Sequence, residues 1–224
     1  MSIESTIKEI RKELPLRTRL VAVSKFHPNE MIMEAYNAGQ RIFGENHVQE
    51  MTQKYNTLPK DIEWHFIGHL QTNKVKYITP FVSVIHGIDT FKLLFEVNKQ
   101  AAKHHRVIPC LLQIHIAEEE TKFGFSFDEC RQMLDMGEWK TLEHVHLCGV
   151  MGMATNTPDV IEVRKEFHSL KTFYDEIKEK YFKDDVLFKE ISMGMTHDYP
   201  IAVEEGSTLV RIGTKIFGER NYNQ

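Results

Sequence analysis

The chain has 224 residues, of which 42% are hydrophobic and 27% charged, a balance typical of a globular protein with a substantial core and not of a disordered or fibrous chain. Its 28 Lys and Arg residues face 32 Asp and Glu residues, and the net charge of −4 provides no general attraction to nucleic acid or anionic lipid. Any anion site must therefore be local.

The N-terminal segment 1–15 has the pattern of an amphipathic helix and not that of a signal peptide. No run reaches the roughly 18 apolar residues that a membrane span needs. The cysteines Cys110, Cys130 and Cys148 are well separated and odd in number, which argues against a disulfide framework and favours buried thiols in a reducing compartment. We expect a cytoplasmic protein without membrane or nucleic-acid partners.

Eight short runs rich in apolar and β-branched residues predict strands. They span 19–25, 41–45, 63–68, 81–88, 107–116, 144–153, 186–194 and 208–214. Helical patterns alternate with them at 29–39, 47–58, 71–78, 90–105, 126–137, 157–182 and 197–206. Capping residues agree: helices are expected to end before Gly39, Gly137 and Gly206 and to begin at Asp89-Thr90, Ser126 and Thr157-Pro158.

Strict alternation of strands and helices indicates parallel βαβ units, and eight of them favour a closed TIM (β/α)8 barrel of the α/β class. Periodicity alone leaves an open doubly wound sheet as the alternative. No linker or repeat divides the chain, and ten residues follow Thr214. We therefore expect residues 1–224 to form a single domain with an extra N-terminal helix.

The first strand ends in a lysine, Lys25, on the same face as Val21 and Val23. If the valines point into the barrel, the amine is partly desolvated, which lowers its pKa and favours attack on a carbonyl to form a Schiff base. The plainer interpretation is that Lys25 extends out to water or pairs with an acid such as Glu45.

Ser192-Met193-Gly194 and Gly213-Thr214 end the last two strands, where barrels of this kind commonly bind phosphate. Ordinary turn chemistry is the alternative. The segment "GTKIFGER" lacks the lysine and hydroxyl of a P-loop, and no GxGxxG follows a strand. The pairs His65/His69 and His144/His146 could share a strand face, but without metal-ligand spacing we interpret most histidines as surface or core-edge residues.

Several blocks in one order are similar to a known family. They are "AVSK" at 22–25, "FGEN" with "VQE" at 43–50, "WHFIGHLQTNK" at 64–74, "ETKFGF" at 120–125, "GVMGMAT" at 149–155, "SMGMTHD" at 192–198 and "GSTLVRIGTKIFGER" at 206–220. Through them the sequence resembles the YggS/PROSC family of pyridoxal 5′-phosphate-binding proteins, also called pyridoxal phosphate homeostasis proteins.

The resemblance implies a single-domain barrel like the N-terminal domain of alanine racemase, with Lys25 in the imine to the cofactor. It implies that the cofactor phosphate is held by Ser192, Thr196, Gly213 and Thr214. Arg211 would face the pyridine nitrogen, and Asn46 would lie near the ring. An arginine keeps its proton, so it leaves that nitrogen neutral and the ring a poor electron sink.

The sequence departs from the usual family pattern at His47, Gly87, His115 and Thr196, and Thr196 keeps the hydroxyl of the serine common there. Lys122 is a family lysine that could help pass the cofactor on; the plainer interpretation is a surface lysine paired with a neighbouring acid.

The resemblance implies a monomeric homeostasis protein that holds pyridoxal phosphate as a lysine Schiff base, buffers it or delivers it to apo enzymes, and turns over no amino acid. The first alternative is an amino-acid racemase with Lys25 and Tyr199 as its two bases, although Tyr199 is more simply a helix-start residue packed on the barrel. The second is a barrel that binds another phosphorylated ligand without an imine.

Overall fold

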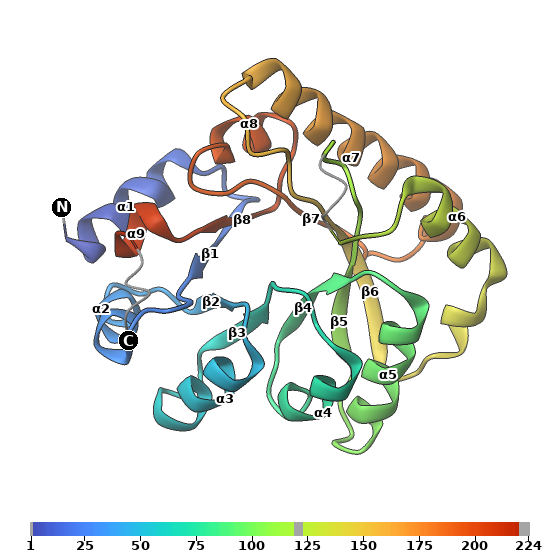
Figure 1. The fold of residues 1–224 in the computed structure, drawn as a ribbon, viewed down its shortest axis with the longest axis horizontal. Helices are drawn as coiled ribbons and strands as arrows, with labels where there is room; N and C mark the ends of the chain where they lie inside the picture. Colours follow the sequence, from blue (N-terminus) through green and yellow to red (C-terminus); the bar gives the residue numbers. More distant parts are fainter. Residues whose placement is uncertain (1, 119–122, 220–224) are drawn as a thin grey trace.

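The computed structural model describes residues 2–118 and 123–219, and its eight parallel strands close into a barrel in the order β1 to β8. Figure 1 looks onto this ring, with the helices arranged around it. The strands are β1 (Arg19–Val23), β2 (Ile42–Glu45), β3 (Glu63–Phe66), β4 (Val84–Ile88), β5 (Ile108–Gln113), β6 (Val145–Met151), β7 (Glu190–Ser192) and β8 (Leu209–Ile212). The closed barrel is confirmed, and the open sheet is excluded by the pairing of β1 with β8.

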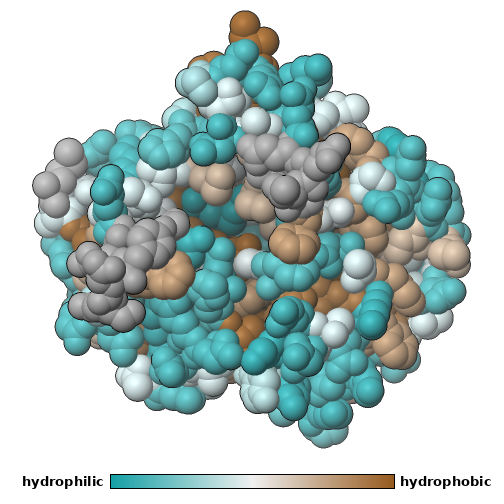
Figure 2. Space-filling model, in the orientation of Figure 1, coloured by the Kyte–Doolittle hydropathy of each residue, from teal (hydrophilic) through white to brown (hydrophobic). Residues whose placement is uncertain are grey.

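The helices follow the predicted alternation. They are α1 (Ile3–Glu13), α2 (Asn29–Asn37), α3 (Val48–Thr57), α4 (Val75–Ile78), α5 (Phe91–Ala102), α6 (Phe127–Met136), α7 (Val160–Tyr181), α8 (Tyr199–Glu204) and α9 (Thr214–Phe217), with short 3-10 turns at Thr72–Lys74 and Glu138–Thr141. In the orientation of Figure 1, hydrophilic residues cover most of the outer surface, and hydrophobic patches lie toward the middle and lower right (Figure 2).

Local chemistry explains most element ends. Ser126 forms a capping box with Glu129 at the start of α6, and Thr90 accepts from the Leu93 amide at the start of α5, as expected. The start predicted for α7 at Thr157-Pro158 is wrong by two residues, because the carboxylate of Asp159 accepts from the amides of Ile161 and Glu162 and makes Asp159 the N-cap.

Two apolar clusters form the core. The larger lies where the helices pack on the barrel, and the smaller consists of Val21, Leu111, Cys148, Met151 and Leu209. Because β1 and β5 are not neighbours in the sheet, the presence of Val21 and Leu111 in one packed cluster places that cluster inside the barrel. Val21 therefore points inward, as the sequence interpretation of the first strand required.

The three cysteines are buried free thiols, and burial raises the pKa of Cys130 and Cys148 to about 12. Across residues 2–118 and 123–219, no helix has the length and apolar character that crossing a membrane requires. In the same ranges, no group of three or more His, Cys, Asp or Glu side chains is arranged to hold a metal ion.

Candidate functional site

The ends of β1 and β8 lie side by side at the carboxyl rim of the barrel. Ala22 pairs with Ile212, so the chain leaves both strands next to each other, toward Lys25 on one side and Gly213-Thr214 on the other. Gly213 packs against β1 so closely that a Cβ there would lie 3.1 Å from the carbonyl oxygen of Val23. The predicted amine and the predicted phosphate loop are therefore brought together.

Lys25 is half-buried in a turn that begins just past the end of β1. The next residue, Phe26, has φ 64°, a left-handed conformation that costs a non-glycine residue about 1–3 kcal/mol. Its amide donates to Glu50 Oε1 over 2.6 Å. A carboxylate on α3 thus stabilises the strained residue beside Lys25.

That carboxylate belongs to a buried ionic group that we call the Lys54 cluster: Ser24, Glu45, Glu50 and Lys54. Lys54 Nζ, on α3, donates to the Ser24 carbonyl oxygen (2.7 Å), to Glu45 Oε1 (2.8 Å) and to Glu50 Oε1 (2.6 Å). The Ser24 hydroxyl also donates to Glu45 Oε1, over 2.6 Å. The cluster therefore hydrogen-bonds the backbone on both sides of Lys25, at the Ser24 carbonyl oxygen and at the Phe26 amide.

Burial raises the pKa of Glu45 to about 7, although Lys54 opposes the shift. Its second oxygen, Oε2, is buried and has no hydrogen-bond partner among the described residues. The sequence interpretation offered Glu45 as a partner for Lys25, whereas the structure gives Oε1 of Glu45 to Ser24 and Lys54.

Arg211 lies on β8 and is 4% exposed. Its Nη1 donates to Ser192 Oγ over 2.6 Å and its Nη2 donates to the Gly152 carbonyl oxygen over 3.1 Å. Burial lowers the pKa of Arg211 to about 10, which leaves the guanidinium charged at neutral pH. Arg211 and Ser192, predicted to contact opposite ends of one cofactor, are thus directly bonded to each other.

Two histidines extend this contact. His86 Nδ1 lies 2.9 Å from Ser192 Oγ, and His86 Nε2 lies 2.9 Å from His65 Nδ1. Both rings are fully buried, and burial lowers the pKa of His65 to about 3 and that of His86 well below its usual value. We call His65, His86, Ser192 and Arg211 the inner relay.

Most histidines are exposed or half-buried, as expected from the sequence, but His65 and His86 are fully buried exceptions. Strand alternation was the available signal: Val84 packs on the inner cluster, and His86 shares its face of β4. His69, which could have shared a strand face with His65, is not part of this contact. Its Nδ1 lies 3.0 Å from Asp89 Oδ2, and its ring stacks on Phe123.

The remaining predicted phosphate residues lie on two adjoining segments. Thr196 is half-buried in the turn between β7 and α8, and the Gly194 carbonyl oxygen accepts from the Arg211 amide over 2.9 Å. Thr214 opens α9, and the amides of Ile216 and Phe217 already bond the Gly213 carbonyl oxygen, so of this short helix the amides of Thr214 and Lys215 have no helical carbonyl to bond. A short helix after the eighth strand is a customary phosphate position of this fold.

Asn46 follows β2, and its Oδ1 is buried with no hydrogen-bond partner among the described residues. Gly87, where the family commonly has serine, lies so close to its neighbour that a Cβ would be 2.5 Å from the Gly68 carbonyl oxygen. A serine at this position would therefore require the Gly68 backbone to shift. His47 places its ring 5.1 Å from that of Phe26, and Lys122 lies outside the described residues.

Tyr199, the second base of the racemase alternative, begins α8 and is buried. Its hydroxyl donates to Glu13 Oε2 on α1 and accepts, over 2.9 Å, from Nζ of Lys215 on α9. The interpretation of Tyr199 as a helix-start residue packed on the barrel agrees with these contacts.

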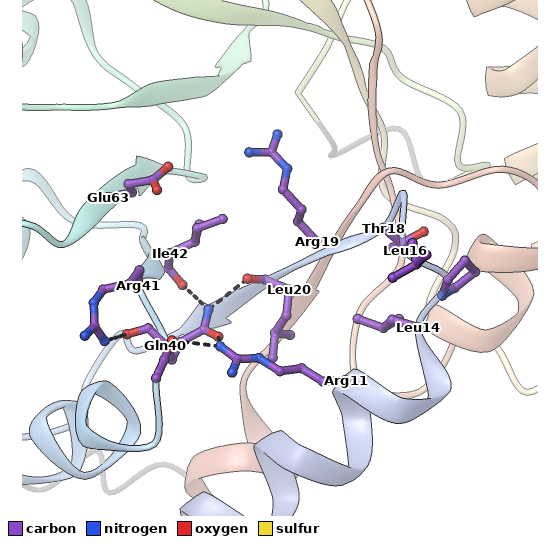
Figure 3. A pocket seen from close by; sticks show the side chains of 12 residues that line it. Arg11, Leu14, Leu16, Thr18, Arg19, Leu20, Gln40, Arg41, Ile42 and Glu63 are labelled. Carbon is purple, nitrogen blue, oxygen red and sulfur yellow. Dashed lines mark hydrogen bonds between the residues drawn. The ribbon is translucent and has the colours of Figure 1, made fainter.

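A cavity of about 350 Å³ opens at the other end of the barrel, where β1, β2 and β3 begin (Figure 3). There the Gln40 amide donates to the Leu20 and Ile42 carbonyl oxygens, and Arg11 donates to Gln40 Oε1. Barrel enzymes and cofactor sites use the carboxyl ends of the strands, so we do not assign the site to this cavity.

The family model described as "Alanine racemase, N-terminal domain" matches residues 1–221. The chain is 41% identical over 207 residues to the pyridoxal phosphate homeostasis protein of Aquifex aeolicus, which covers 91% of this chain and 88% of the relative.

Among solved structures, PipY of Synechococcus elongatus PCC7942 with PLP bound superposes with a TM-score of 0.87 at 34% identity, over 97% of this chain and all of that one. The alanine racemase of Clostridium difficile 630 has a TM-score of 0.75 at 13% identity and is covered to 57%, which shows a shared fold.

Proposed function

The chain belongs to the family of pyridoxal phosphate homeostasis proteins, and on that premise we propose that it holds pyridoxal 5′-phosphate reversibly on Lys25, for buffering or delivery, without turning over an amino acid. The observation that carries the proposal is the convergence of three features at one rim: the Lys25 turn, the Gly213-Thr214 loop and the buried Arg211.

The residues present fit this cofactor. Pyridoxal phosphate supplies an aldehyde that condenses with a primary amine and releases water, and Lys25 is the amine at the rim. Thr196, Gly213 and Thr214 offer hydroxyls and helix-opening amides to a phosphate. Asn46 Oδ1, buried and unpaired within residues 2–118 and 123–219, offers an acceptor for a ligand hydroxyl.

Arg211 supports binding over catalysis. A guanidinium donates hydrogen bonds but does not release its proton near neutral pH, so a ring nitrogen facing it stays neutral and the ring withdraws electrons weakly. Tyr199 has its hydroxyl engaged by Glu13 and Lys215, which gives the racemase alternative no available second base at this residue. We propose that the protein acts as a monomer in the cytoplasm and that its recipients are apo enzymes that need the cofactor.

Titration of the purified protein with pyridoxal phosphate, followed by visible absorption, tests the proposal. The wild type and Lys8→Ala, which removes an exposed lysine on α1, should both become yellow, and Lys25→Ala should not. A colourless wild type, or a coloured Lys25→Ala, would contradict it.

Two further measurements separate a binder from an enzyme. Incubation with D- and L-amino acids, analysed by chiral chromatography, should leave the isomer ratio unchanged; turnover that Lys25→Ala abolishes would show an enzyme. Reactivation of an apo enzyme should proceed from the loaded protein, and the comparison with free cofactor at equal concentration measures delivery.

A further inference from the structure

The inner relay is a continuous chain of side chains inside the barrel. It runs from Arg211 on β8 through Ser192 on β7 and His86 on β4 to His65 on β3, with contacts of 2.6, 2.9 and 2.9 Å. His65, His86 and Ser192 have no exposed surface. Because water does not reach these atoms, the positions of their hydrogens are set by the hydrogen bonds within the inner relay.

The hydrogens can be placed in two ways. A guanidinium only donates, so Ser192 Oγ accepts from Arg211 in both. In the first arrangement Ser192 donates to His86 Nδ1 and His86 Nε2–H donates to His65 Nδ1. In the second the direction is reversed, His86 Nδ1–H donates to Ser192, and the Ser192 hydrogen is left over.

The two arrangements differ in the number of buried polar groups that they leave unpaired. His65 Nε2 is buried and has no partner among the described residues, so the first arrangement leaves one unpaired group, its N–H. The second leaves the His65 lone pair and also the Ser192 hydroxyl hydrogen. Buried unpaired polar groups are costly, so the first arrangement is the more stable one.

From this direction we propose that Ser192 and His86 are positioning residues for Arg211 and do not hold the cofactor phosphate. Ser192 directs its only hydrogen inward to His86 and presents a lone pair to Arg211. The phosphate then depends on Thr196, Gly213 and Thr214. This inference rests on the proposed function and changes the role that the family resemblance implied for Ser192.

Binding of pyridoxal phosphate and of pyridoxal, which lacks the phosphate, tests this division. Ser192→Ala and His86→Phe should weaken the binding of both ligands by similar factors, so that the ratio of the two dissociation constants stays within about twofold of wild type. Both variants should also alter the pH profile of the visible absorption, because Arg211 is less well fixed in them. Thr214→Val should instead weaken only the phosphorylated ligand, by about tenfold.

His86→Asn serves as the conservative variant, since its amide oxygen can accept from Ser192 where His86 Nδ1 does, and it should restore the wild-type pH profile. If Ser192→Ala reduces the preference for the phosphorylated ligand as Thr214→Val does, Ser192 holds the phosphate and the proposal is wrong.

Nitrogen-15 NMR of the histidine rings tests the direction without any ligand. Both His65 and His86 should carry their hydrogen on Nε2, before and after pyridoxal phosphate is added. A hydrogen on His86 Nδ1 in either state would overturn the proposal. A wild type that binds neither aldehyde would contradict the proposed function, whereas the ring spectrum of the ligand-free protein would still decide the direction of the relay.

Discussion

Two buried polar networks lie on either side of the candidate site, and they differ in charge. The Lys54 cluster is ionic, with one ammonium between two carboxylates, and packs between the barrel and α3. The inner relay lies inside the barrel, and burial keeps both of its histidines neutral. The Lys54 cluster stabilises a strained turn beside the amine, whereas the neutral Ser192 and His86 of the inner relay hold its one cation, Arg211, in place.

Their pH dependence has opposite sign. Burial lowers the folded-state pKa of His65 to about 3, below the ordinary 6.5, so its contribution to stability is present above about 6.5 and is lost as pH falls. Burial raises the folded-state pKa of Glu45 from 4.5 to about 7, so its contribution is present below 4.5 and is lost as pH rises through 7. Between pH 5 and 7 the two effects offset each other.

Removal of Lys54 is the largest expected change. Lys54→Met leaves Glu45 and Glu50 without their cation in a buried site and should lower the free energy of unfolding by about 3–5 kcal/mol, measured by urea denaturation. Lys171→Met is the matched control, because Lys171 pairs with Asp175 on the exposed face of α7 and should cost less than about 1 kcal/mol. If Lys54→Met lowers the free energy of unfolding no more than Lys171→Met does, the Lys54 cluster contributes no more to stability than an exposed ion pair.

Variants of His65 and Glu45 should change the pH dependence of the unfolding free energy in opposite directions. In His65→Leu, unfolding free energy should rise by about 2 kcal/mol, relative to wild type, between pH 7 and pH 5; in Glu45→Gln it should fall by about the same amount. Urea denaturation at several pH values in this range measures both. A change of the same sign in the two variants would refute the contrast between the networks.

Ser126→Ala should have a small effect and serves as a control far from both networks. Loss of the capping box of α6 should cost about 1 kcal/mol of stability and leave the visible spectrum with pyridoxal phosphate unchanged. If the spectrum changes as it does in Ser192→Ala, the spectral readout reports general loosening of the barrel and not the position of Arg211.

The alternation of strands and helices predicted the fold, and the strand ends predicted the rim, because the carboxyl ends of all strands in a parallel barrel meet on one side. Lys25, Arg211 and Gly213 were placed there from apolar runs alone. Boundaries were less accurate: β4 begins at Val84 and not at 81, because the amides of Phe81 and Val82 bond the Ile78 carbonyl oxygen in a turn after α4.

The polar interior was not predictable in the same way. Glu50 and Lys54 have the spacing of a helical ion pair, but nothing in that spacing shows that the pair is buried or that Lys54 reaches the Ser24 carbonyl oxygen. His65 and His86 lie 21 residues apart, and the pairing of β3 with β4 brings their rings together. Such contacts depend on which strands become neighbours, which periodicity does not specify.

The proposed function depends on Lys25 as the attachment point of the cofactor. Reduction of the loaded protein with borohydride, followed by proteolysis and peptide mass spectrometry, tests it directly. We expect one pyridoxyl phosphate group per chain, on Lys25, and none in Lys25→Ala. A label on another lysine in the wild type, with Lys25 unmodified, would contradict it.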